Sequence, residues 1–145
     1  MVFGQNKKVD FPVFGEMKYR ASYWLGQIRL DTFSTEVEII LRAKKDGPTS
    51  AQIRAMTDFL ANQHTIKTQA ISDMLALFKE CGVQLKEDEL WKDLEAAQIE
   101  LTDENYDVDT HDISILVIFS SQSIPEFCPA IEIVNGHFAG VLSGT

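Results

Sequence analysis

Residues 48–82 decide the fold of this chain, and they read PTSAQIRAMTDFLANQHTIKTQAISDMLALFKECG. The turn-forming tripeptide Asp46-Gly47-Pro48 opens this stretch. Thr49, with Gln52 three residues later, matches the capping box that satisfies free backbone N–H groups at a helix start. A first amphipathic helix should therefore begin at Thr49 or the next residue and end near residues 62–64.

A second and stronger amphipathic run follows, in which apolar side chains cover nearly half of the helix surface. Its apolar positions are Ile66, Ala70, Ile71, Met74, Leu75, Leu77, Phe78 and Cys81. Gly82 then provides the left-handed residue at which many helices end. The spacing predicts a helical hairpin whose two apolar stripes need a sheet or another helix to cover them.

The segment before the hairpin alternates apolar and polar residues, which is typical of strands with one buried face. This alternation predicts consecutive antiparallel strands over residues 15–19, 23–30 and 36–42. The first of them is entered through Pro12, and Gly15 marks a bend.

The segment after the hairpin contains one more helix and further strands. Residues 86–95 predict a short third helix, residues 97–101 a half-exposed strand and residues 102–112 an acidic loop. Residues 113–119 are apolar on both faces, which predicts a central strand covered on both sides. Asn135-Gly136 is a strong hairpin signal between two short apolar segments. We therefore expect one α+β domain over residues 1–145, with a largely antiparallel sheet of about 5–7 strands, the helical hairpin and a short third helix.

Composition narrows the classes of function. The chain has 145 residues, 45% of them hydrophobic, and two cysteines in no metal or redox spacing, so both thiols should be free. Its N-terminus lacks the apolar core of a secretion signal, and we expect a cytoplasmic protein. Residues 79–112, which we call the acidic segment, hold twelve acidic and three basic residues and so carry the whole net charge of -9. This argues against nucleic acid or an anionic membrane as a direct partner and favours a basic protein surface. The alternative is a solvated acidic face that only aids solubility.

Motifs for chemistry are weak. Asp103-x-Asn105-x-Asp107 matches the first half of a calcium loop, but Val108 stands where the turn glycine belongs and Ser114 where the bidentate glutamate belongs. The three histidines are isolated and lack a second ligand at metal spacing. We therefore expect no metal and no cofactor.

A nucleophilic cysteine is the remaining catalytic option. Cys128 could meet His137 across a hairpin arm and a loop, although a cysteine between Phe127 and Pro129 is more often a packed thiol. Exposed carboxylate pairs in the acidic segment would stay ionised and are poor candidates for acid–base chemistry.

Aromatic residues within the acidic segment are candidates for partner contact, because aromatic anchors ringed by charge are typical of binding hot spots. Trp91 is at helical spacing from Leu94 and fits the core better, whereas Tyr106 fits a contact residue better. The candidate partner-binding residues are Glu87, Asp88, Trp91, Asp93, Glu95, Glu100, Asp103, Glu104, Tyr106, Asp107, Asp109 and Asp112.

Several segments occur in an order that is found in a known group of proteins. They are Val13-Phe14-Gly15-Glu16-Met17, Trp24-x-Gly26, Val37-Glu38-Ile39-Ile40-Leu41 and Gly47-Pro48-Thr49-x-x-Gln52. In this order the chain resembles small bacterial domains of uncharacterised function, some of which have been proposed as immunity proteins of polymorphic toxin systems. The resemblance covers most of the first 95 residues, and its motifs are structural. The late loop differs, because that group usually carries a Trp-Asp-x-Glu-His-Gly type of stretch there.

The resemblance and the charge together lead to a functional expectation. We expect a binding protein that is not an enzyme, and that inhibits a basic, nuclease-like toxin through its acidic segment. A small enzyme that uses Cys128 or the loop carboxylates is one alternative. A structural or oligomerisation domain is another.

Overall fold

One uninterrupted helix, α1 (Ser50–Glu80), occupies the segment in which a hairpin of two helices was expected. In the computed structural model, which describes residues 7–143, no turn interrupts the chain near His64. The sequence holds neither glycine nor proline between Pro48 and Gly82, and the buried positions Phe59, Ile66 and Ala70 continue at helical spacing through the expected break. The predicted hairpin is therefore wrong.

Both ends of α1 are as expected from the sequence. The Thr49 hydroxyl accepts a hydrogen bond from the backbone N–H of Gln52, and the Gln52 side chain accepts one from the Thr49 N–H, which completes the capping box. Beyond the last turn, Gly82 has a φ of 84°, a left-handed conformation that glycine adopts without strain.

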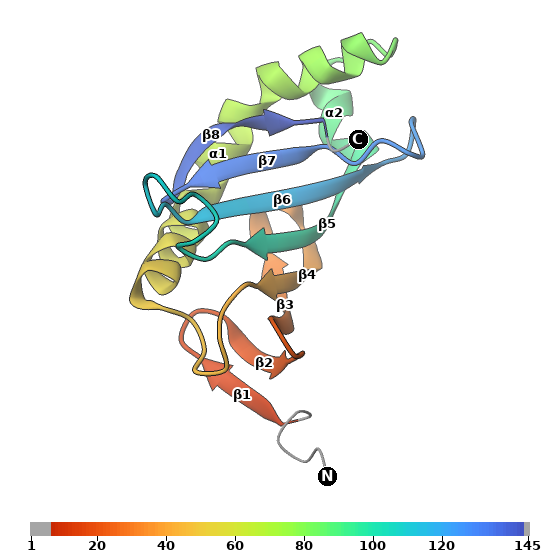
Figure 1. Cartoon of the computed structure of the whole chain (residues 1–145). Helices are drawn as coiled ribbons and strands as arrows, with labels where there is room; N and C mark the ends of the chain where they lie inside the picture. The colour runs from red at the N-terminus through yellow and green to blue at the C-terminus, as the bar shows by residue number, and fades with distance from the viewer. Residues whose placement is uncertain (1–6, 144–145) are drawn as a thin grey trace.

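Eight strands lie side by side in chain order and form one sheet (Figure 1). They are β1 (Lys8–Phe11), β2 (Gly15–Tyr19), β3 (Trp24–Leu30), β4 (Thr35–Leu41), β5 (Leu94–Leu101), β6 (Ser114–Ser121), β7 (Ala130–Val134) and β8 (His137–Leu142). All neighbours are antiparallel except β4 and β5, which are parallel because α1 and the short helix α2 (Glu87–Asp93) connect them. The α+β class is confirmed.

The strand count exceeds the expected range because the N-terminal segment folds back on itself. Residues 12–14 form a turn in which Val13 has a φ of 66°, so the chain before Pro12 becomes β1 and pairs with β2. The turn at Asn135-Gly136 was predicted correctly and joins β7 to β8.

Both helices lie on one side of the sheet (Figure 1). The core is the layer between them, where α1 packs against β6, β7 and β8 and against the 3-10 turn η2 (Asp31–Phe33). Buried side chains from the sheet include Ile39, Ile99 and Val117, which are 0% exposed. The covered face of the sheet and the apolar stripe of α1 therefore form one hydrophobic core.

The prediction that the strand near residues 113–119 is covered on both sides is wrong. β6 is central, but its Leu116 and Ile118 point away from the helices and are only half-buried. Neighbouring side chains on β5 and β7 shield them in part, among them Glu100 and Glu132. The sheet thus has one bare face with apolar residues along its middle strands.

Candidate partner-binding surface

The loop between β5 and β6, residues 102–113, gathers six of the predicted contact residues at one end of the sheet. We call it the acidic loop. Its five carboxylates belong to Asp103, Glu104, Asp107, Asp109 and Asp112, and it contains no lysine or arginine. Solvent-exposed like charges this close together create a strongly negative surface.

Hydrogen bonds to side chains order the acidic loop internally. Asp103 Oδ1 accepts from the N–H of Asn105 at 2.9 Å, and Asp107 Oδ1 accepts from the N–H groups of Asp109 and Thr110 at 3.1 and 3.2 Å. Such turns, in which an aspartate side chain accepts from the backbone ahead, explain why aspartate fits these positions. The hydrogen bonds from Thr110 and Asp109 hold the pKa of the Asp107 carboxyl below its usual value.

Both ends of the acidic loop are tied to the body of the protein. At the start, Gln52 of α1 donates from Nε2 to the Thr102 carbonyl at 3.0 Å, and the Thr102 hydroxyl accepts from the Ser114 N–H at 2.9 Å. At the end, Asn135 donates to Asp112 Oδ1 at 2.8 Å and accepts from the N–H of Ile113 at 3.1 Å. The loop is therefore preorganised, which lowers the entropy cost of binding through it.

Two large hydrophobic side chains project from the acidic loop. Tyr106 is 62% exposed and Val108 is 72% exposed. Sequence reasoning identified Tyr106 but missed Val108, because a valine inside an acidic stretch carries no signal of its own. Exposed apolar side chains surrounded by carboxylates have the composition of a contact surface for another protein.

Hollows flank the acidic loop on two sides. One of about 220 Å³ is lined by Arg42, Glu100 and Tyr106, and it adjoins one of about 320 Å³ between the loop and the start of α1. A third, of about 310 Å³, lies between α1 and the loop's far end, where Asp58 and Asp112 line it. These hollows could receive side chains of a partner that rests on Tyr106.

Of the other predicted contact residues, only Glu100 borders this surface, through the hollow that it lines together with Tyr106. Glu87 and Asp88 are exposed on the first turn of α2, which leads into the opposite end of β5. The eight residues of β5 span roughly 26 Å, so about this distance separates the two acidic groups. Glu95 and Glu100 lie between them on β5, and Glu100 forms an ion pair with Arg42 at 2.8 Å.

Asp93 is buried, and its carboxylate is used in hydrogen bonds within the chain. It is 8% exposed, and its carboxylate accepts hydrogen bonds from the Ser121 hydroxyl at 2.6 Å and from the Ser123 N–H at 2.9 Å. The Ser123 hydroxyl also donates to it. Its role is to fix the loop that follows β6, which sequence periodicity alone does not reveal.

Trp91 belongs to an aromatic cluster on the covered side of the sheet. Its ring lies 5.6 Å from that of Phe33 and 5.9 Å from that of Phe119, with the Lys67 ammonium 5.3 Å from its centroid. Burial lowers the pKa of Lys67. Trp91 is only half-buried, but these contacts make it mainly a packing residue, as its helical spacing suggested.

The proposed pairing of Cys128 with His137 does not form. Cys128 precedes β7 and His137 follows it, so the five strand residues between them span roughly 16 Å. Among residues 7–143, no group of three or more His, Cys, Asp or Glu side chains is arranged to hold a metal ion. Asp103 and Asp107, which match the first half of a calcium loop, each accept hydrogen bonds from backbone N–H groups of the acidic loop.

Comparisons with protein-family models, with curated proteins and with solved structures found no match to this chain. No helix in the described part of the chain is long and apolar enough to cross a membrane.

Proposed function

We propose that this chain is a binding protein that recognises a basic protein partner through the acidic loop. The observation that supports this most directly is the exposure of Tyr106 and Val108 on a loop that carries five carboxylates and is fixed at both ends. An aromatic anchor, a charged surround and a preordered backbone favour tight and selective association. This role requires no chemistry by the chain itself.

The proposed partner is a nuclease-like toxin, and the chain is its immunity protein. Enzymes that cleave nucleic acid need cationic clefts to hold phosphate groups. A concentrated acidic surface would be attracted to such a cleft and would block it, and its charge would accelerate encounter. The resemblance of most of the first 95 residues to a group of small bacterial domains, some of which have been proposed as immunity proteins, is consistent with the same role.

We propose a contact surface at one end of the sheet. The surface comprises Asp103, Glu104, Tyr106, Asp107, Val108, Asp109 and Asp112. We leave out Asp93 and Trp91, whose side chains are used for packing, and the α2 carboxylates, which lie near the other end of β5.

A salt-dependent capture experiment tests this proposal. The immobilised chain is incubated with cytosol of the source organism at low and at high salt, and captured proteins are identified by mass spectrometry. The test variant is Asp103→Asn, Glu104→Gln, Asp107→Asn, Asp109→Asn. Asparagine retains the side-chain oxygen that accepts the backbone hydrogen bonds of the loop, so the charge changes while the turns remain.

The matched control removes four exposed carboxylates on the helix side, through Asp73→Asn, Glu80→Gln, Glu87→Gln and Asp88→Asn. We expect wild type and this control to capture a basic protein at low salt, and the loop variant to lose it. Equal capture by the loop variant, or loss only in the control, would contradict the proposed surface.

A further inference from the structure

The bare face of the sheet carries a row of side chains that crosses six strands. The strand register aligns them from β2 to β7 in the order Lys18, Leu25, Ile40, Glu100, Leu116 and Glu132. The midline of this row lies between β4 and β5. Lys18 and Glu132 are equally far from the midline, and so are Leu25 and Leu116.

Two charges in this row lack a partner within the chain. Among residues 7–143 the ion pairs are Arg29–Asp31 and Arg42–Glu100, so Lys18 and Glu132 belong to none. Both side chains are half-buried. Lys18 is directly opposite Leu25 on β3 and Lys8 on β1, and Glu132 is directly opposite Leu116 on β6 and Gly140 on β8. A half-buried charge that has no ion-pair partner is stabilised when an opposite charge approaches it.

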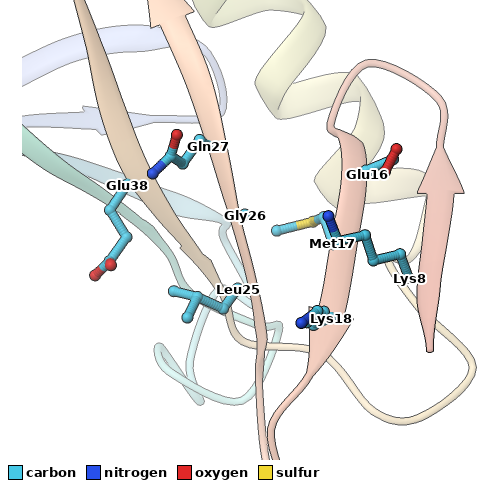
Figure 2. A pocket seen from close by; sticks show the side chains of 8 residues that line it. All are labelled: Lys8, Glu16, Met17, Lys18, Leu25, Gly26, Gln27 and Glu38. Atoms are coloured by element: carbon cyan, nitrogen blue, oxygen red, sulfur yellow. The ribbon is translucent and has the colours of Figure 1, made fainter. Parts of the chain in front are cut away.

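A hollow of about 560 Å³ lies on the same face between β2 and β3. Figure 2 shows residues that line it, with Met17 and Lys18 on β2 and Leu25 and Gly26 on β3. At the mirrored position across the midline, β6 presents the half-buried side chains of Leu116 and Ile118. β6 is thus as far from the midline as β3, the strand that borders the hollow.

We propose that two copies of the chain associate through their bare sheet faces, about a twofold axis that runs parallel to the strands between β4 and β5. This axis places β2 of one copy over β7 of the other and β3 over β6. Lys18 then meets Glu132 twice, and Leu25 meets Leu116 twice. The apolar pair of β6 faces the hollow beside β3.

The neighbouring row is compatible with the same axis. It reads Gln27, Glu38, Gln98, Ile118 and Ala130 from β3 to β7. Under the twofold, Gln27 meets Ile118 and Glu38 meets Gln98, so no like charges are opposed in this row. Opposed like charges are what usually excludes a geometry of self-association.

The expected strength follows from the area. Six strands about 4.8 Å apart and roughly 20 Å long give a footprint of about 600 Å² per copy, or about 1,200 Å² in total. This is near the lower limit for a specific complex. The dimer should therefore be reversible and depend on concentration in the micromolar range.

The test is sedimentation velocity over a concentration series. Wild type should shift from the monomer mass of 16.3 kDa toward twice that value. Lys18→Glu and Glu132→Lys each oppose like charges at two symmetric positions and should each weaken association at least about tenfold. The double variant Lys18→Glu, Glu132→Lys restores opposite charges and should recover most of the wild-type dimer. Circular dichroism of each variant excludes misfolding as the cause.

Matched controls are Lys92→Glu and Glu80→Lys, which make the same changes at exposed sites on the helices. They should dimerise as wild type does, and so should the variant with the neutralised acidic loop. A monomer at every concentration, or a double variant no better than the single ones, would overturn the proposal. Because the acidic loop lies beyond the strand ends, loss of this dimer with retained partner capture would leave the proposed function intact.

Discussion

Replacing Gln52 with glutamate should make the stability of this protein depend on pH. Gln52 is 0% exposed and is the point at which α1, β4 and the acidic loop meet. Its Nε2 donates to the carbonyls of Arg42 at 2.8 Å and of Thr102 at 3.0 Å, while its Oε1 accepts from the Thr49 N–H at 3.0 Å. Glutamate has the same shape but presents an oxygen to the two carbonyls.

The magnitude follows from burial and from those two acceptors. Both the lack of solvent and the facing carbonyl oxygens disfavour the ionised carboxylate, so the pKa of the introduced group should be raised in the folded state. In the unfolded chain it ionises near pH 4.3, so above that pH the folded state binds more protons than the unfolded state. Stability relative to wild type should therefore fall by about 1.4 kcal/mol per pH unit, until pH reaches the folded-state pKa.

The assay is urea unfolding of wild type, Gln52→Glu and Gln52→Leu between about pH 5 and 8. The leucine variant leaves the same backbone groups without a hydrogen-bond partner and introduces no titrating group. Its free energy of unfolding should therefore be about 3 kcal/mol lower than that of wild type at every pH. A constant difference between the glutamate variant and wild type, or a leucine variant as stable as wild type, would refute the role assigned to Gln52.

Further predictions concern single sites elsewhere in the chain. Asp93→Ala leaves buried hydroxyl and N–H groups unpaired. It should lower the free energy of unfolding by about 2–3 kcal/mol and speed proteolysis within residues 122–129. Unchanged cleavage would show that Asp93 does not fix this loop. Because its pKa is lowered, Asp107 should titrate below 3.8 in an NMR pH series. The order that its hydrogen bonds give the loop should be present above that pH and lost as pH falls through the folded-state pKa. A midpoint above 3.8 would show that those hydrogen bonds do not persist in solution. Gly136→Ala places a Cβ against the Asp58 side chain at a φ of 87° and should lower the melting temperature more than Gly82→Ala, where a Cβ meets open space at a φ of 84°. Equal decreases in melting temperature for the two variants would mean that the Asp58 side chain on α1 moves aside at little cost in free energy.

Local signals in the sequence predicted much of the fold. The capping box at Thr49, the helix end at Gly82 and the hairpin at Asn135 each depend on a few adjacent residues, and all three are present. Alternation found most strands for the same reason. The expected break near His64 was wrong because polar residues on the exposed face of one long helix look like a junction.

Long-range packing could not be predicted in the same way. Residues 113–119 are apolar on both faces of the strand. This pattern is the same whether the second face is covered by a helix layer or left bare, so periodicity could not distinguish the two cases. For the candidate site, charge counting found the acidic loop, but it also included Asp93. Only the fold shows that Ser121 and Ser123 enclose that carboxylate. Gln52 was identified as a cap, whereas its contact with Thr102, 50 residues away, required the tertiary structure.

The most direct test of the proposed binding function is the rate at which the captured basic partner associates with the chain, measured by stopped flow across a salt series. Wild type should associate rapidly at low salt and slow steeply as salt rises, because the acidic loop attracts the partner. The variant with the neutralised loop should associate at least about tenfold more slowly at low salt and depend less on salt. Equal rates and equal salt dependence for the two proteins would contradict the proposal that the acidic loop is the contact surface.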